Sequence, residues 1–129
     1  MTRPVEYLDV DDLVHLATLL LGVPAPLRDV GLLGAAAARP QTTAFGSDAY
    51  PDIWTKAAAL LQSIVKNHPL VDGNKRLGWL ATAVFLELNG TKVTDVASNA
   101  VYEFVVAVAA GKQTIEGIAD GLRALAAAA

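Results

Sequence analysis

Cysteine is absent from the 129 residues of the chain, and histidine occurs only twice. Disulfide bonds, a thiolate nucleophile and a cysteine-ligated zinc ion are therefore excluded, and a histidine-rich metal site is nearly excluded as well. Aromatic residues make up 6% and charged residues 18% of the sequence, the latter below the roughly 25% of an average soluble domain. Because disordered chains are rich in charge and poor in apolar residues, we expect a folded chain.

Long apolar runs and an excess of positive charge are also missing. The longest apolar stretches, residues 16–25 and 105–110, are far shorter than the roughly 20 residues that span a bilayer. The first residues lead into acids, whereas a secretory signal has a basic start and an apolar core. The formal net charge is −3, and nucleic-acid-binding domains are usually basic. We therefore expect a cytoplasmic protein with no membrane segment and no direct binding to nucleic acid.

Alanine and leucine are the residues in excess. They account for much of the 53% apolar content, and both favour helices. The length fits one domain, since single domains cluster at roughly 100–150 residues. The composition predicts an all-α fold in which residues 1–129 form a single domain, a compact bundle of about six helices.

Apolar periodicity and capping residues place the helices at residues 9–22, 32–38, 52–67, 74–89, from 94 or 95 to 111, and 114–128. The helix ending at 111 is apolar on almost every side except Glu103, which predicts a largely buried central helix. Residues 41–52 are the least helical stretch, and we expect a small hairpin or flap at 41–50. The alanine clusters at 35–38 and 57–59 fit either a groove for a partner or tight helix contacts in the core.

Positive charge gathers in one turn between two predicted helices. Residues 66–76 read Lys-Asn-His-Pro-Leu-Val-Asp-Gly-Asn-Lys-Arg. A helix that starts at Asn74 directs unpaired N–H groups into the turn, and Gly73 leaves room for a ligand oxygen to approach them. Lys75 and Arg76 add full charges, so the turn is a candidate phosphate-binding site. Lys66 is a further candidate, although a lysine at a helix end is more often simply solvated.

The same turn holds a candidate base and a candidate metal ligand. The imidazole of His68 could accept the proton of an attacking hydroxyl near neutral pH. Asp72 is the only acid in the turn and suits Mg²⁺, which favours one or two carboxylates together with phosphate oxygens and water. A base, an anion-binding hole and a metal ligand are the parts that phosphoryl or nucleotidyl transfer requires.

The run from His68 to Arg76 resembles the signature of the Fic/Doc superfamily, roughly His-x-Phe-x-Asp/Glu-Gly/Ala-Asn-Gly/Lys-Arg. Stretches at 27–33, 38–40, 57–61 and 85–90 extend the resemblance over about residues 5–95. Classical Fic adenylyltransferases have Gly at the position of Lys75 and Arg at that of Trp79, so this chain is more similar to the death-on-curing (Doc) branch. Leu70 departs from the family's Phe, which anchors the loop in the core.

This resemblance implies a toxin of a type II toxin–antitoxin system. Doc toxins use ATP and Mg²⁺ to phosphorylate a threonine of elongation factor Tu, which halts translation, and a Phd-like antitoxin segment restrains them. His68 would be the base, and Asp72 and Lys75 would also serve catalysis, with Asp72 as the metal-associated acid. The phosphate-binding residues would be Gly73, Asn74, Lys75 and Arg76, and a target-positioning flap would lie at 41–50.

Two alternatives stay open at this point. The chain could be a Fic-type AMP transferase acting on a protein hydroxyl, which differs only in the phosphate that meets the hydroxyl. It could instead be a catalytically decayed module that binds an antitoxin, with Leu70 as the mark of the decay.

Overall fold

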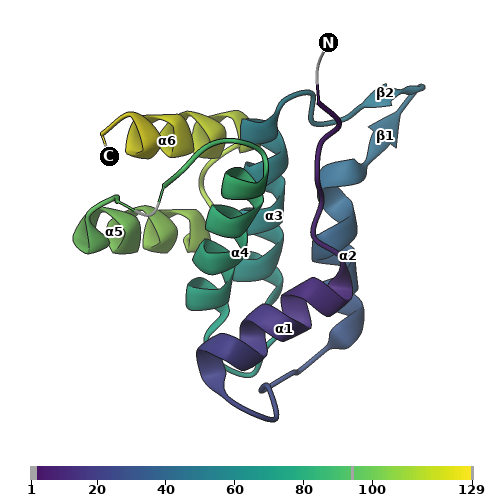
Figure 1. Cartoon of the computed structure of the whole chain (residues 1–129), viewed down its shortest axis with the longest axis vertical. Helices are drawn as coiled ribbons and strands as arrows, with labels where there is room; N and C mark the ends of the chain where they lie inside the picture. The colour runs from purple at the N-terminus through teal and green to yellow at the C-terminus, as the bar shows by residue number, and fades with distance from the viewer. Residues whose placement is uncertain (1–2, 94, 129) are drawn as a thin grey trace.

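Helix α3 (Ile53–Asn67) lies at the centre of the computed structural model, which describes residues 3–93 and 95–128 (Figure 1). It contacts helices on all sides. The other elements are α1 (Val10–Leu21), α2 (Val30–Ala38), the 3-10 turn η1 (Arg39–Gln41), β1 (Thr43–Ala44), β2 (Ser47–Asp48), α4 (Asn74–Leu88), α5 (Ser98–Ala109) and α6 (Ile115–Ala128). Within the described residues the only sheet is the hairpin of β1 and β2, so the predicted all-α fold is confirmed. None of the described helices is long and apolar enough to cross a membrane.

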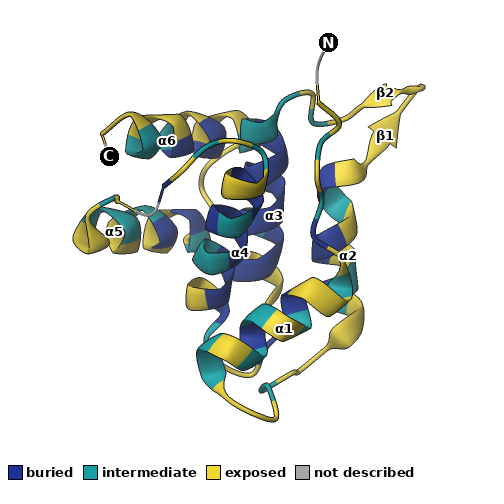
Figure 2. Cartoon of the chain, in the orientation of Figure 1, coloured by how far each residue is buried: buried dark blue, intermediate teal, exposed yellow. Residues whose placement is uncertain are grey.

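The small side chains of α3 explain its central place. Ala57, Ala58 and Ala59 have no exposed surface, and most of the helix is dark blue in Figure 2. Small residues let neighbouring helices approach closely. Gly78 of α4 also allows a close approach to α3, because a Cβ there would lie 2.8 Å from the Val65 side chain. The alanine cluster at 57–59 therefore forms helix contacts in the core and is not a partner groove.

The prediction of a buried central helix ending at residue 111 is wrong. In α5 only Val105 and Val108 are buried, while Tyr102 and Val106 are exposed. The helix lies at the edge of the bundle, where its apolar residues cover one side of α3 and α4. Apolar content alone could not identify the central helix, because the sequence of α5 is more apolar than that of α3.

The predicted start of α5 at Thr94 or Asp95 also needs correction. Thr94 lies outside the described residues, and the helix begins at Ser98. Val93 is buried, and Val96 packs against the core. Burial of these two side chains holds the chain in a turn, so the helix starts only after it.

The ends of α1 and α2 follow the capping rules. Asp9 and Asp12 form a capping box at the start of α1, which confirms that the acidic cluster marks a helix start. Asp29 accepts a hydrogen bond from the Leu32 N–H at 3.1 Å and caps α2. Helix α2 therefore begins at Val30, two residues before the predicted position.

A hairpin occupies the predicted flap, but it lies far from the turn that carries His68. β1 and β2 pair antiparallel next to the first residue of α3, whereas His68 follows the last residue. The 15 residues of α3 span about 22 Å, and Figure 1 places the hairpin and the turn at opposite ends of the helix. The hairpin does not line the cavity described below.

A buried lysine holds this hairpin against α3. The Lys56 amine donates to the Tyr50 carbonyl at 2.6 Å and to Asp48 Oδ2 at 3.2 Å, although the residue is only 1% exposed. It also lies 5.8 Å from the centre of the Tyr7 ring. Burying an amine is favourable only when it is paired in this way.

We expect Lys56→Met to lower the free energy of unfolding by about 1–3 kcal/mol, because the hairpin loses charge-assisted hydrogen bonds while the core keeps an apolar stem. Urea denaturation would measure the change. Lys112→Met is the control, since Lys112 is exposed between α5 and α6. Equal stability of the two variants would contradict the role of Lys56.

Candidate active site

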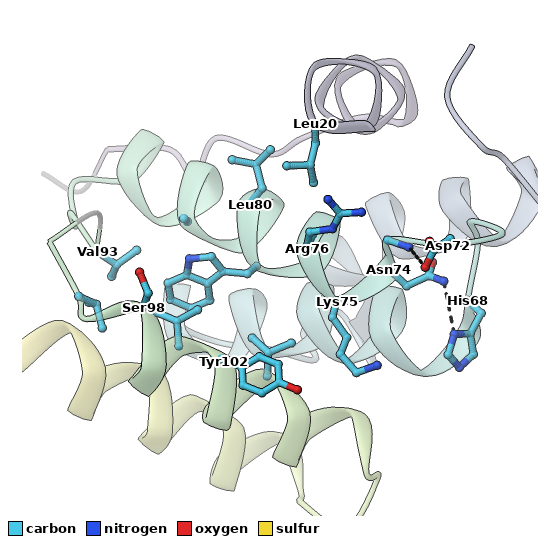
Figure 3. Close-up of a pocket in the computed structure, with 16 residues that line it drawn as sticks. Leu20, His68, Asp72, Asn74, Lys75, Arg76, Leu80, Val93, Ser98 and Tyr102 are labelled. Atoms are coloured by element: carbon cyan, nitrogen blue, oxygen red, sulfur yellow. Dashed lines mark hydrogen bonds between the residues drawn. The ribbon is translucent and has the colours of Figure 1, made fainter. Parts of the chain in front are cut away.

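The turn between α3 and α4, residues 68–73, brings most of the predicted site residues together (Figure 3). His68 is the C-cap of α3 and adopts a left-handed backbone conformation with φ +52°. Residues other than glycine seldom adopt this backbone conformation, so contacts with neighbouring residues have to hold His68 in it. The imidazole lines a cavity of about 790 Å³ beside α4.

The connection between α1 and α2 provides part of that support. Leu27 forms an antiparallel bridge with Leu70. The Val71 N–H donates to the Pro26 carbonyl at 2.8 Å, and the Arg28 N–H donates to the Pro69 carbonyl at 2.8 Å. An extended segment thus runs along the turn on one side.

Asn74 closes the turn from within. This residue is 8% exposed; its Oδ1 accepts from the Leu70 N–H at 2.9 Å, and its Nδ2 donates to the Leu70 carbonyl at 3.0 Å. These two bonds fix the orientation of the amide, and its NH₂ group faces Nδ1 of His68 at 3.4 Å. Asn74 is one of the predicted phosphate-binding residues. Its side chain holds the turn and the imidazole, so its backbone N–H is the group that it can offer to a ligand.

Leu70 is buried at 1% exposure and belongs to the main core. The family's Phe is expected to anchor the loop at this position. Leu70 provides an apolar anchor of smaller size, so its presence does not by itself indicate a decayed site.

The N-terminus of α4 has the free donors that the sequence predicts. The backbone N–H groups of Asn74, Lys75 and Arg76 have no acceptor among the described residues, and the first bond inside the helix is from Leu77 N–H to the Gly73 carbonyl at 2.9 Å. No side chain caps this end. Three unpaired N–H groups and the helix dipole favour an anion here.

Gly73 is required at this position for two reasons. Its φ is +85°, and a Cβ would lie 2.7 Å from Cδ1 of Leu21 at the end of α1. The contact also explains how α1 is held against the turn.

We expect Gly73→Ala to destabilise the fold more than Gly90→Ala, as measured by thermal unfolding. Both positions have positive φ, but nothing lies within 4 Å of a Cβ at Gly90. The control therefore carries only the backbone strain of about 1–2 kcal/mol, while Gly73→Ala adds a clash. If the two variants lose equal stability, the contact with Leu21 is not a constraint.

Lys75 and Arg76 both line the cavity and extend to different sides of it. Figure 3 shows Arg76 extending toward Leu20 and Lys75 toward Tyr102. Neither forms an ion pair within the part of the chain that the structure describes. Cations in the first turn of a helix are unfavourable for its dipole, so two unpaired ones there point to an anionic ligand.

The structure does not bring Lys66 to this cavity. The side chain is exposed, and its amine lies 3.6 Å from the position of a Cβ on Gly111, after the end of α5. The Lys66 side chain projects from a different face of α3 than the one next to the cavity. Its closeness to the turn in the sequence therefore does not bring it to the candidate phosphate site.

Asp72 offers an exposed carboxylate at the mouth of the site. Its Oδ1 accepts from the Gly73 N–H at 2.8 Å, and Oδ2 has no partner among the described residues. No three His, Asp or Glu side chains cluster in the described parts of the chain. A single hard oxygen ligand beside an anion hole suits Mg²⁺, which completes its coordination with phosphate oxygens and water.

The far part of the cavity is apolar, and the sequence did not reveal it. Helices α4 and α5 form its walls, and the lining residues beyond the turn are Leu20, Trp79, Leu80, Ala83, Val93, Val96, Ser98, Val101, Tyr102 and Val105. Apolar walls with a cationic end suit a ligand that joins a flat ring to phosphates. Periodicity marks some of them, such as Leu80, Val101 and Val105, as apolar-face residues, and the space between α4 and α5 follows only from the placement of α5.

Comparison with known proteins identifies the family. The family model described as Fic/DOC family matches residues 7–86. The curated protein "Toxin Doc" of Mycolicibacterium smegmatis (strain ATCC 700084 / mc(2)155) is 46% identical over 125 residues, which cover 96% of this chain and 96% of that protein. The matched residues include the whole turn from His68 to Arg76. The chain belongs to the Fic/DOC family.

Proposed function

We propose that the chain is a Doc-type toxin that transfers the γ-phosphate of ATP to a Ser or Thr hydroxyl of a protein. One observation carries the proposal: His68 lines the same cavity as three unpaired N–H groups and two unpaired cations at the start of α4. A base beside an anion hole is the arrangement that phosphoryl transfer to a hydroxyl needs.

The residues act in one step. The imidazole of His68 accepts the hydroxyl proton as the hydroxyl oxygen bonds to the γ-phosphorus, and the bond from that phosphorus to the bridging oxygen breaks to release ADP. The N–H groups of residues 74–76, with Lys75 and Arg76, stabilise the charge on the phosphate oxygens. Asp72 would hold Mg²⁺, which neutralises phosphate charge when it is bound.

The apolar part of the cavity would hold the adenine. Trp79 and Tyr102 line it, and aromatic side chains stack well on flat rings. The phosphates would then extend along α4 toward its N-terminus. In this orientation the end of the triphosphate, and not its α-phosphate, would lie near His68, which supports transfer of the γ-phosphate.

The biological role follows from the relative. The 46% identity to a protein named Toxin Doc, over nearly the full length of both chains, supports a toxin role for this chain. The same role includes a cognate Phd-like antitoxin whose peptide segment restrains the toxin. Elongation factor Tu in the cytoplasm is the proposed target, and its phosphorylation would halt translation.

Label transfer tests the proposal. Purified protein is incubated with Mg²⁺, elongation factor Tu and ATP labelled either at the γ- or at the α-phosphate. The proposal predicts γ-label on the target and no α-label. Label from α-labelled ATP would mean AMP transfer instead. Absence of both labels, together with antitoxin binding but no ATP binding in calorimetry, would support the non-catalytic alternative.

A further inference from the structure

We propose that Arg28 is a positioning residue that holds His68 in its left-handed conformation by closing the C-terminus of α3. Its effect on catalysis rests on the proposed phosphotransfer, but its effect on the geometry of His68 does not. Sequence reasoning gave Arg28 no role. It lies 40 positions before His68 and in a different connection of the fold.

The end of α3 lacks the donors that usually close a helix. The last carbonyls of a helix have no partner within it, and N–H groups of the residues after the C-cap commonly bond to them. Here the first is Pro69, which has no N–H. The second, Leu70, donates its N–H to the side chain of Asn74 at 2.9 Å. The third, Val71, donates its N–H to the Pro26 carbonyl at 2.8 Å. None of the three residues therefore donates to the carbonyls of Asn67 and His68.

Arg28 supplies the missing donors from its side chain. Its Nε donates to the His68 carbonyl at 2.6 Å, and its Nη2 donates to the Asn67 carbonyl at 2.7 Å. The guanidinium thus holds two successive peptide groups with two donors in a fixed plane, which a lysine cannot do. Its charge is also favourable at the negative end of the α3 dipole.

The main chain of Arg28 is itself fixed by hydrogen bonds, which restricts the movement of its guanidinium. The N–H groups of Arg28 and Asp29 both donate to the Pro69 carbonyl, at 2.8 and 3.0 Å. Asp29 is also the N-cap of α2. The backbone around His68 is therefore bonded to one short segment. The Arg28 side chain bonds to the carbonyls of Asn67 and His68, and the main chain of residues 28–29 bonds to the Pro69 carbonyl.

The hydrogen bonds from Arg28 matter for His68 because the backbone conformation of His68 is unfavourable by itself. A residue with a Cβ at φ +52° tends to return to the right-handed or extended region once its peptide groups are free. Such a change would redirect the imidazole away from the α4 N-terminus. Displacement of a catalytic group by about 1 Å can cost about 100-fold in rate.

The test combines a spectroscopic and a kinetic readout on Arg28→Ala and Arg28→Lys. The chain has two histidines, so the imidazole NMR spectrum contains two sets of signals, and the exposed His15 on α1 is an internal reference. We expect the His68 signals to shift or broaden in both variants while those of His15 stay unchanged. We expect kcat for phosphotransfer to fall about 100-fold in Arg28→Ala, with the KM for ATP within about twofold. The fall in kcat should be smaller in Arg28→Lys, because an ammonium can still bond to one carbonyl.

Arg39→Lys is the matched control. The Arg39 guanidinium also bonds to α3, at Gln62 Oε1 and Ser63 Oγ, but away from its C-terminus. We expect the His68 signals of Arg39→Lys to match those of the wild type. Unchanged His68 signals and kcat in folded Arg28 variants would overturn the proposal, as would equal losses in the Arg28 and Arg39 variants. An inactive wild-type protein would contradict the proposed function, and the NMR arm would still decide the role of Arg28.

Discussion

Replacing His68 by asparagine is expected to lower the rate of phosphotransfer by about 10²–10⁴-fold, the usual contribution of a general base. Asparagine is chosen because it tolerates the left-handed conformation that His68 adopts. The variant therefore removes the base and keeps the backbone of the turn. Transfer of γ-label to the protein target under single-turnover conditions measures the effect.

His15→Asn is the control for this prediction. His15 is exposed on α1, outside the cavity, and its variant should transfer phosphate at the wild-type rate. Binding of ATP should be nearly unchanged in His68→Asn, because the proposed phosphate site is at the start of α4. If the folded His68 variant keeps the full rate, His68 is not the base.

Replacing Arg76 by alanine is expected to weaken ATP binding about 10–100-fold. Hydrogen bonds to a charged group are worth about 1.5–3 kcal/mol, and about 1.4 kcal/mol corresponds to a factor of ten in affinity. Arg76 lines the cavity and has no carboxylate partner in the described residues, so no internal ion pair is lost with it. Calorimetric titration with a non-hydrolysable ATP analogue and Mg²⁺ measures the change.

Arg123→Ala provides the comparison for Arg76. Arg123 is an arginine of α6 that pairs with Asp120 at 2.7 Å and does not line the cavity. Its variant should bind the analogue as the wild type does. Raising the salt concentration should weaken wild-type binding more than that of Arg76→Ala, since screening acts on the charge that the variant lacks. Equal affinities of the wild type and Arg76→Ala would remove Arg76 from the site.

The local parts of the site could be predicted from the sequence because they depend on neighbours along the chain. Pro69 ends one helix, Gly73 precedes the next, and Asn74 begins it, so the turn and its free N–H groups follow from residue types alone. The caps that Asp9 and Asp29 form also depend only on residues within one turn of each helix. Each of these features is decided within a few residues.

The parts that failed depend on contacts between distant segments. Whether α3 or α5 lies at the centre is set by packing, and apolar content favours α5 although α3 is the buried helix. Arg28 reaches Asn67 and His68 only because two connections lie side by side. Lysine is usually exposed, yet Lys56 is buried beside the hairpin. Periodicity carries no information on such long-range pairs.

The central claim is that the terminal phosphate of ATP binds at the N–H groups of Asn74, Lys75 and Arg76, next to His68. Titration of ¹⁵N-labelled protein with a non-hydrolysable ATP analogue and Mg²⁺, followed by NMR, tests it most directly. The account predicts that the backbone amide signals of these three residues shift more than those of any other segment, with the His68 imidazole shifting alongside them. Saturable binding that leaves these amides unchanged and shifts signals elsewhere would contradict it.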